Sequence, residues 1–316
     1  MTLKTKLFLS VVIPAYNESE NLEKTLGELQ ATLHNSAFVE NFEILIVDDH
    51  SSDGTFELLR SLRSERVQGI RLSRRSGSHV ALRAGITQAR GEAVLCISAD
   101  GQEDCGVLNE MIQKLQAGSH IVWGVRRRRE DPGLIRLLSL TAYRLIDFLV
   151  NPYAAESNPP HADFYLLSRK TVDAINQCQE RNTSLFGLIL WLGFKQVSVE
   201  YDRKPRRSGK SKWRFNSRMR LLVDWIIAFS GLPLKLISFL GILTASLGFL
   251  YAIFVIVYTL LGYARPGWAE TVTLILVLGG VQMIMLGVVG EYLWRTLDET
   301  RKRPLYFVEE KTGSDD

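Results

Sequence analysis

The sequence predicts an α/β protein with a mostly parallel, doubly wound sheet, followed by a hairpin of two membrane-spanning helices. Between Leu7 and Val125, short apolar runs alternate with segments whose apolar residues recur at helical spacing. Strand and helix in alternation are typical of parallel sheets joined by right-handed crossovers. Two uncharged runs follow at 236–264 and 271–290. Each meets the roughly 20 residues that a helix needs to cross the hydrocarbon layer.

The first strand is expected at Leu7 to Pro14, an apolar, β-branched run typical of a strand that is buried on both faces. The helix after it begins near Asn17, where polar residues that cap helix starts precede apolar residues at helical spacing. The same alternation continues along the chain. It predicts further strands at 42–49, 67–73, 92–98 and 119–125, and helices at 17–33, 53–62, 77–89 and 105–116.

Sheets of this kind bind ligands at the carboxyl ends of their strands. We therefore expect four segments to lie along a single edge: Pro14 to Glu18, Asp48 to Ser51, Ser73 to Gly77 and Ser98 to Gln102. No G-x-G-x-x-G follows the first strand, and the P-loop lysine pattern does not occur. Dinucleotide binding and P-loop chemistry are therefore disfavoured.

The first two segments carry groups suited to a nucleotide. The ring of Tyr16 can stack on a base, and the carboxylate of Glu18 can accept a hydrogen bond from an exocyclic amine or an imide. Asp48 or Asp49 can accept from a base or from a ribose hydroxyl. For each polar residue taken singly, the alternative is helix capping, which applies to Asn17, Glu18, Ser51 and Asp53.

The fourth segment has the form of an acidic turn that holds a divalent metal between carboxylates one residue apart, but Ser98 replaces the first carboxylate. Asp100 and Gln102 still supply two oxygens, and phosphate oxygens and waters typically complete the octahedron of Mg²⁺ or Mn²⁺. The hydroxyl of Ser98 can hold a metal-bound water. We expect weaker metal binding rather than loss of function.

Positive charge is concentrated in two segments, although the net charge of +4 is modest. The stretch "GVRRRRE" ends the strand at 119–125, and the stretch from Arg203 to Arg220 carries nine Lys or Arg residues and no acid. These cations suit phosphate groups. Anionic lipid head groups are an alternative partner, because they attract basic segments near a membrane. Nucleic acid is a further alternative, which the adjacent membrane hairpin disfavours.

The uncharged runs predict transmembrane helices at about 234–262 and 270–293, joined by the loop "ARPGWAE". Lysine and arginine flank both outer ends, whereas the loop holds only Arg265, so both termini are expected on the cytoplasmic side. Apolar and aromatic residues at helical spacing predict an amphipathic interfacial helix at 216–231. The alternative is a pair of buried helices in a soluble bundle. The three cysteines, odd in number and without zinc spacing, are expected to be free thiols.

Several stretches resemble family-2 glycosyltransferases of the GT-A fold. They are "VVIPAYNESENL", "ILIVDDHSSDGT", "LSRRSGSHVALRAGITQARGEAVLCISADGQ" and "GEYLWRTLDETRKRPLYF". Together with "RRSGKSKW", they make the chain similar to polyprenyl-phosphate glycosyltransferases, the group that contains dolichyl-phosphate mannose synthase and bacterial undecaprenyl-phosphate glucosyl- and aminoarabinosyltransferases. The resemblance runs from about residue 8 to 308 and includes both predicted spans.

The resemblance implies roles for individual residues. Family members hold the nucleotide on residues that match Pro14, Tyr16, Glu18 and Asp49, and we expect Asp48, Ser98 and Asp100 to join this site. A Mg²⁺ or Mn²⁺ ion would bind a D-x-D-x-Q pattern, which matches Ser98, Asp100 and Gln102. The residues expected to bind the acceptor or other phosphates are Arg126, Arg136, Ser139, Arg207, Ser211 and Lys212.

Asp163 lies near the sugar by the same resemblance and is expected to fix a sugar hydroxyl, with strand-end capping as the alternative. The residues expected to act in catalysis are Asp100, Asp163 and Arg126. Two departures from the family pattern concern the metal and the sugar. The metal motif continues with "EDCG" instead of an acid and two prolines, and Tyr165 stands where relatives place Arg in a D-F-R-L motif.

The expected reaction is the inverting transfer of one sugar from a nucleotide donor to polyprenyl phosphate at the cytoplasmic face of the plasma membrane. A lipid phosphate is already an anion at neutral pH, so it can attack the anomeric carbon without a general base. UDP-glucose is the first donor to consider, and GDP-mannose and modified arabinose or hexosamine donors stay open. The product would serve cell-surface glycosylation. The resemblance also implies a homo-oligomer that assembles through the hairpin.

The expected organisation is a cytoplasmic catalytic domain at 1–215, the interfacial helix at 216–231, the two spans within 232–295 and a cytoplasmic tail at 296–316. Two other functions are considered. A non-catalytic, nucleotide-binding membrane subunit is favoured by Ser98 and Tyr165. A processive polysaccharide synthase is disfavoured because the sequence contains no Q-x-x-R-W motif.

Overall fold

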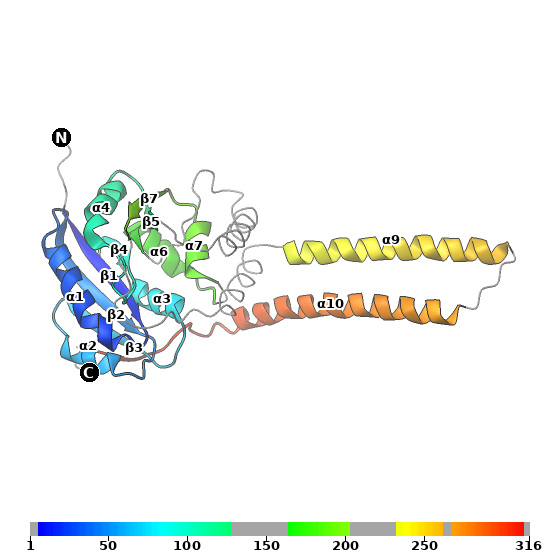
Figure 1. Ribbon diagram of the computed structural model, residues 1–316, viewed down its shortest axis with the longest axis horizontal. Coiled ribbons are helices and arrows are strands. Elements are labelled where there is room, and N and C mark those ends of the chain that lie inside the picture. Colours follow the sequence, from blue (N-terminus) through cyan, green and yellow to red (C-terminus); the bar gives the residue numbers. More distant parts are fainter. Residues whose placement is uncertain (1–5, 128–163, 182, 203–231, 262–266, 313–316) are drawn as a thin grey trace. The chain divides into compact units, whose positions relative to one another are not determined.

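The computed structural model describes residues 6–127, 164–181, 183–202, 232–261 and 267–312. The chain divides into two compact units (Figure 1). One unit comprises residues 1–218 and 304–316 and holds a β-sheet, whereas the other comprises residues 219–303 and holds two long helices. The chain therefore leaves the sheet unit, forms the helical unit and then returns.

The described strands of the first unit form one sheet of eight, in the order β7-β5-β6-β4-β1-β2-β3-β8. The pairs β1–β2, β2–β3, β1–β4 and β5–β7 are parallel, whereas β6 and β8 run antiparallel to their neighbours. The predicted mostly parallel sheet is confirmed. The strands are β1 (Leu7–Ala15), β2 (Val39–Asp48), β3 (Val67–Leu72), β4 (Ala93–Cys96), β5 (Ile121–Arg126), β6 (Tyr165–Ser168), β7 (Gln196–Tyr201) and β8 (Val308–Lys311).

Helices pack on both faces of this sheet (Figure 1). Alternate residues of β1 divide between the two faces: Leu9, Val11 and Ile13 belong to a core cluster shared with α1, α2 and α4, whereas Val12 faces α3. An unbroken apolar strand sequence is typical of this arrangement, because both sides are buried. The helices are α1 (Ser19–His34), α2 (Thr55–Ser61), α3 (Ser78–Gln88), α4 (Leu108–Gln116), α6 (Arg169–Gln177) and α7 (Leu185–Trp191), with a 3₁₀ turn η1 (Cys105–Val107).

Helix α3 lies close against the sheet because Gly85 has no side chain. A Cβ at this position would stand 2.3 Å from Cγ1 of Val12 and 3.1 Å from Cγ2 of Val47. The helix begins at Ser78, directly after Gly77, whose φ of +95° is one that residues with a Cβ rarely adopt. The packing of α3 therefore fixes where the loop after β3 meets the edge of the sheet.

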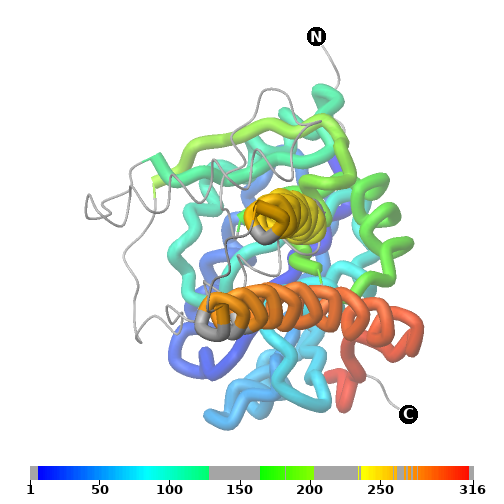
Figure 2. Tube along the Cα trace, turned by 90° about the vertical axis from the view of Figure 1, so that its right-hand side faces the viewer, coloured from blue at the N-terminus to red at the C-terminus, as the bar shows by residue number. Residues whose placement is uncertain are grey.

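The second unit contains α9 (Leu232–Leu260) and α10 (Trp268–Thr300), which have 29 and 33 residues (Figure 1 and Figure 2). Both helices are long and apolar enough to cross a membrane. Their large apolar side chains are exposed, among them Phe249 (69 %) and Ile275 (63 %). The alternative of two buried helices in a soluble bundle is therefore wrong.

The segment that the sequence predicted as a cytoplasmic tail, 296–316, contains regular structure. Helix α10 continues to Thr300, and β8 pairs with the edge strand β3. Thr312 N donates to Gly69 O at 2.8 Å, and Gly69 N donates to Thr312 Oγ1 at 2.7 Å. The unpaired backbone groups of an edge strand favour such an addition. The expected interfacial helix at 216–231 lies outside the described residues.

Candidate functional site

The carboxyl ends of β1, β2, β3 and β4 meet at one edge of the sheet, as predicted. Asp49 N donates to Ala15 O at 2.8 Å, which joins the ends of β1 and β2. The loop after β4 lies beside α1, because Thr25 Oγ1 donates to Ala99 O at 3.3 Å. Segments that are far apart in the sequence thus form one continuous rim.

Asp49 organises the loop after β3. Its two carboxylate oxygens accept hydrogen bonds from the backbone N–H groups of Ser76 at 2.6 Å and Gly77 at 2.8 Å. Burial raises the pKa of the Asp49 carboxyl, while these two bonds and the nearby Arg75 and His50 oppose the rise. Each carboxylate oxygen has a further lone pair, so the bonds leave acceptor capacity for a base or a ribose.

Asp48 is fully buried at the end of β2. Its Oδ1 accepts a hydrogen bond from Ser51 N at 3.1 Å. Its Oδ2 has no hydrogen-bond partner among the described residues and lies 3.9 Å from Arg71 Nε. Burial raises the pKa of the Asp48 carboxyl against the bonds from Ser51 and the charge of Arg71. Asp48 thus has a supporting position under the loop that carries Asp49, and direct contact with a nucleotide stays a prediction.

Tyr16 lies at the same edge, where the guanidinium carbon of Arg75 stands 4.0 Å from the centroid of its ring. This is a cation–π contact, and it covers one face of the ring that the sequence predicted to stack on a base. Glu18 Oε2 accepts a hydrogen bond from Asn21 Nδ2 at 2.8 Å. Pro14 is half-buried near the end of β1. Arg75, which the sequence pattern did not single out, brings a cation to the predicted nucleotide site.

The first residues of α1 and α2 are held by Asp53, whereas the N-cap residues of these helices, Glu18 and Gly54, make no side-chain capping bond. Asp53 Oδ2 accepts from Ser19 N at 3.2 Å, and its Oδ1 accepts from Thr55 N at 3.1 Å. Burial acts to raise the pKa of Asp53, but the bonds from Thr55 and Ser19 outweigh it and lower the pKa. Asn17 Oδ1 accepts from Ser52 N at 2.9 Å. The loops before α1 and α2 are therefore fastened to each other.

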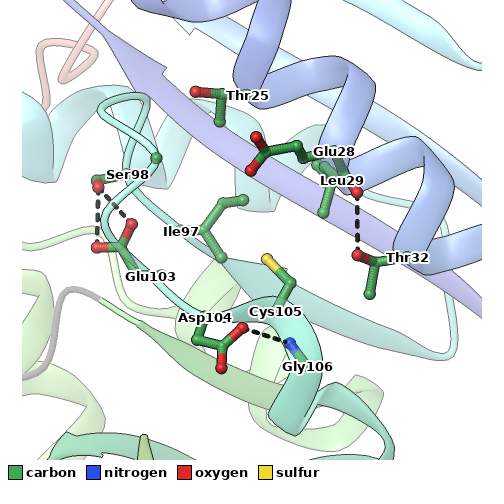
Figure 3. Close-up of a pocket in the computed structure, with 11 residues that line it drawn as sticks. Thr25, Glu28, Leu29, Thr32, Ile97, Ser98, Glu103, Asp104, Cys105 and Gly106 are labelled. Atoms are coloured by element: carbon green, nitrogen blue, oxygen red, sulfur yellow. Dashed lines mark hydrogen bonds between the residues drawn. The ribbon is translucent and has the colours of Figure 1, made fainter. Parts of the chain in front are cut away.

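The acidic turn after β4 contains a carboxylate that the sequence pattern did not single out, Glu103. Ser98 Oγ lies 2.6 Å from Asp100 Oδ1. It also lies 2.8 Å and 2.6 Å from the two carboxylate oxygens of Glu103 (Figure 3). A hydroxyl has one proton, so it cannot donate to both carboxylates at once. Asp100 and Glu103 therefore share one hydroxyl oxygen, which brings the two carboxyl groups close together in the turn.

The donors in this turn fit a hard divalent cation. Two carboxylates, an amide and a hydroxyl occur within residues 98–103, and oxygen ligands are those that Mg²⁺ and Mn²⁺ prefer. No group of three or more His, Cys, Asp or Glu side chains forms a metal site in the described part of the chain.

A small pocket of about 50 Å³ lies between α1 and the acidic turn. Ser98 and Glu103 line one side of it, and Thr25 and Glu28 of α1 line the other (Figure 3). A volume of this size holds a few water molecules. The turn is therefore accessible to small polar species.

On the acceptor side, Arg126 ends β5, and its side chain makes no hydrogen bond or ion pair with any other residue that the structure describes. The neighbouring Arg127 is engaged, with ion pairs to Glu200 at 3.4 Å and Asp202 at 3.2 Å. The other predicted residues lie outside the described parts of the chain: Arg136, Ser139, Asp163, Arg207, Ser211 and Lys212.

Tyr165, which stands at the position of an arginine in the family pattern, is 3 % exposed and lies in the core. Its ring centroid is 5.3 Å from that of Trp123. The adjacent Cys96 is buried, and burial raises the pKa of its thiol to about 12. All three cysteines are free, as predicted.

The model of the family described as glycosyl transferase family 2 matches residues 10–173. The chain belongs to glycosyl transferase family 2. The matched range contains the sheet edge from Pro14 to the acidic turn, so the protein is a glycosyltransferase and the resemblance seen in its sequence is confirmed.

Relatives match nearly the whole chain. An uncharacterized glycosyltransferase from Synechocystis is 39 % identical over 308 residues, which cover 96 % of each protein. A prophage bactoprenol glucosyl transferase homolog from Escherichia coli is 34 % identical over 309 residues, 95 % of this chain and 98 % of that protein. The bactoprenol glucosyl transferase of Shigella phage SfV is 34 % identical over 309 residues, with coverage of 95 % and 97 %.

Solved structures support the fold. A glucosyl-3-phosphoglycerate synthase from Mycobacterium tuberculosis, in complex with phosphoglyceric acid, aligns with a TM-score of 0.50 and 20 % identity. The alignment covers 70 % of this chain and 79 % of that one. The GT-A fold expected for the sheet unit is confirmed.

Three charged side chains at or beside this edge emerge only from the structure: Glu103, Arg75 and Glu309 of β8. Glu103 follows the metal motif directly, at the position where the family pattern has an acid, and that match was a usable indication. Arg75 lies within the segment 73–77 that was already expected at the edge. Glu309 lies 3.2 Å from Arg71 because β8 pairs with β3, more than 200 residues earlier in the chain, and no local pattern indicates this contact.

Proposed function

We propose that this glycosyltransferase moves a single sugar from a nucleotide sugar to a polyprenyl phosphate at the cytoplasmic face of a membrane. The observation that carries the proposal is the combination, in one chain, of a GT-A sheet edge and two exposed apolar helices long enough to span a bilayer. Relatives named bactoprenol glucosyl transferases support the lipid acceptor and make UDP-glucose the first donor to test.

In the proposed donor site the base lies against Tyr16, and the nucleotide donates hydrogen bonds to the carboxylates of Glu18 and Asp49. Arg75 lies over the ring of Tyr16 on which the base is proposed to stack. If Arg75 leaves the ring when the nucleotide binds, the ring can stack on the base and the guanidinium can bind a phosphate. Asp163 is proposed to hold a sugar hydroxyl.

The acceptor phosphate is proposed to attack the anomeric carbon directly. A bond forms from a phosphate oxygen to that carbon while the bond from the carbon to the nucleotide diphosphate breaks, which inverts the anomeric centre. No proton has to be removed from the attacking group, so the site needs no general base. The protein's tasks are to bring two anions together and to stabilise the leaving group. Arg126 and the cations at 203–220 supply positive charge for the first task.

Asp100 and Gln102 are proposed to hold a Mg²⁺ or Mn²⁺ ion, with Glu103 supplying the negative charge that Ser98 does not. When bound, such an ion neutralises charge on the departing diphosphate. The two carboxylates that meet at Ser98 Oγ support an active site over a relic. The second candidate, a non-catalytic subunit, is favoured by Ser98 itself and by the burial of Tyr165.

The return of the chain to its sheet supports the proposed topology. Because β8 pairs with β3, the segments before α9 and after α10 belong to one unit, so the helices cross the membrane an even number of times. The Lys and Arg bias puts that unit in the cytoplasm. A membrane-impermeant maleimide should label Gly267→Cys in intact cells but not Ser314→Cys; the reverse pattern would refute the orientation. Assembly through the hairpin stays a prediction.

A thermal-shift panel tests the donor site. The purified full-length protein is melted with UDP, GDP, ADP or CDP, each with and without Mn²⁺. We expect one nucleotide to raise the melting temperature, and Mn²⁺ to increase that rise because ion and diphosphate bind together. If no nucleotide changes the melting temperature, the proposed donor site is wrong.

A further inference from the structure

The C-terminal strand reaches both loops of the candidate nucleotide edge. Strand β8 begins at Val308, shortly after the last residue of α10, Thr300. Phe307 O accepts a hydrogen bond at 3.0 Å from the backbone N–H of Ser73, the first residue of the loop that Asp49 holds. The end of the chain therefore contacts the loop after β3 through its backbone.

The carboxylate of Glu309 contacts the second loop. Its Oε2 lies 3.2 Å from Arg71 Nε and 3.5 Å from His50 Nδ1. His50 follows Asp49 directly and has a φ of +59°, a conformation that residues with a Cβ adopt only when their surroundings hold them there. Glu309 thus lies beside His50, the residue whose positive φ turns the backbone of this loop.

Arg71 links Glu309 to the interior of the same loop. Besides Glu309, its guanidinium contacts Asp48 Oδ2 at 3.9 Å and donates to Ser51 O at 3.4 Å. It also lies over the ring of Phe56, 5.3 Å from the centroid. Arg71 therefore contacts both the buried carboxylate of Asp48 and the carboxylate of Glu309. It links strand β8 to the loop from Asp48 to Ser51.

We propose that Glu309 is a positioning residue of the donor site: through Arg71 and His50 it holds the loop from Asp48 to Ser51 in the form that binds a nucleotide. The inference rests on the proposed function, since it assigns a role at the same nucleotide edge. This role makes β8, the strand that follows the proposed membrane hairpin, part of the donor site. Residues 301–307 then connect α10 directly to a strand of that site.

The next residue along β8 provides a matched control. Glu310 forms two hydrogen bonds with Arg60 of α2, at 2.9 Å from Nε and 2.6 Å from Nη2. Both partners of this pair are exposed, and neither contacts the loop from Asp48 to Ser51. Glu309→Gln and Glu310→Gln each remove one charge from the same strand. The first removes the contacts with Arg71 and His50 at the donor edge, whereas the second removes the pair with Arg60.

The test measures nucleotide affinity in the full-length protein by calorimetric titration with UDP and GDP. For the nucleotide that binds, we expect Glu309→Gln to raise the Kd about three- to fivefold, the effect of losing one partly exposed ion pair. Glu310→Gln should leave the Kd unchanged. Backbone hydrogen exchange at residues 48–51 and 73–77 should become faster in Glu309→Gln alone, and Glu309→Asp should recover part of the affinity.

Three outcomes contradict the inference, and they are distinguishable. An unchanged Kd in Glu309→Gln, with binding intact in the wild type, overturns the positioning role and leaves the proposed function standing. Equal weakening in both variants shows that β8 contributes general stability only. If the wild type binds neither UDP nor GDP, and none of the other nucleotides of the thermal-shift panel, the donor site itself is wrong and the inference fails with it.

Discussion

Among single side chains, Glu103 is the one that we propose supplies the negative charge of the metal site in place of the carboxylate missing at Ser98. We expect Glu103→Gln to lower the apparent Mn²⁺ affinity at least about tenfold, because it removes one of the two negative groups at the site. The measurement is the Mn²⁺ dependence of turnover, together with Mn²⁺ binding followed by electron paramagnetic resonance in the presence of the nucleotide.

A compensating change tests the same idea. In the double variant Ser98→Asp, Glu103→Gln, the carboxylate returns to the first metal position, so Mn²⁺ affinity should recover. Asp104→Asn is the control, since Asp104 accepts a hydrogen bond from Gly106 N within the same loop. If the double variant binds Mn²⁺ as weakly as Glu103→Gln does, the idea that Glu103 replaces the carboxylate missing at position 98 is refuted.

Asp48 is expected to lower the stability of the unliganded protein at neutral pH, because burial opposes its charge. Its folded-state pKa lies above the ordinary value of 3.8, so the folded protein binds this proton more tightly than the unfolded chain. The cost is fully present above the raised pKa and disappears as the pH falls below 3.8. Asp48→Asn should therefore melt about 2–4 °C higher than wild type at pH 7.

That advantage should shrink as the pH is lowered, which thermal scans of both proteins across the acid range will show. An Asp48→Asn variant that melts lower than wild type at neutral pH would contradict the assignment. The same variant should bind nucleotide more weakly, as is usual when stability and activity trade off at a functional carboxylate.

The sequence predicted where the aspartates of this edge lie, but it did not predict the contacts that they and their neighbours make. The spacing of apolar runs placed Asp48, Asp49 and Asp100 at strand ends, because alternation along the chain determines where strands stop. It could not show that Arg75 covers Tyr16 or that Glu103 turns back to Ser98, because these contacts depend on loop conformation. Loop conformation is set by tertiary hydrogen bonds such as those of Asp49.

At the level of secondary-structure elements, the approach of α3 to the sheet depends on Gly85. We expect Gly85→Ala to destabilise the protein by about 1–3 kcal/mol, because the new methyl group would clash with Val12 and Val47. Gly27→Ala in α1 is the matched control. No atom lies within 4 Å of a Cβ built there, so alanine should be neutral or stabilising in this helix. Thermal unfolding measures the melting temperature of both variants. An equal change in the two would refute the packing argument.

The elements up to β5 follow from the sequence, whereas β7 and β8 do not. The early strands are unbroken apolar runs, and such runs reveal strands that are buried on both faces. Strand β8 reads Val-Glu-Glu-Lys, which has no apolar alternation. It forms because the edge of β3 offers unpaired backbone groups, and only the tertiary structure shows that this edge is within reach.

In the molecule as a whole, the chain passes from the sheet unit to the two apolar helices and then returns to the sheet unit. Composition revealed the two parts, because the charged and uncharged stretches are sharply separated. It did not reveal that residues 304–316 rejoin the first unit. This return places a strand that follows the two apolar helices in the same sheet as the candidate site.

The most direct test of the proposed function is transfer by the purified full-length protein from radiolabelled UDP-glucose in the presence of Mn²⁺. The acceptors compared are undecaprenyl phosphate and undecaprenol, which differ only in the phosphate. We predict label in the organic phase with the phosphate and none with the alcohol, because the attacking group must already be an anion. Equal labelling of both lipids would contradict the base-free mechanism. No labelling with either lipid, from UDP-glucose or from the GDP-mannose, aminoarabinose and hexosamine donors, would leave the non-catalytic subunit as the better description.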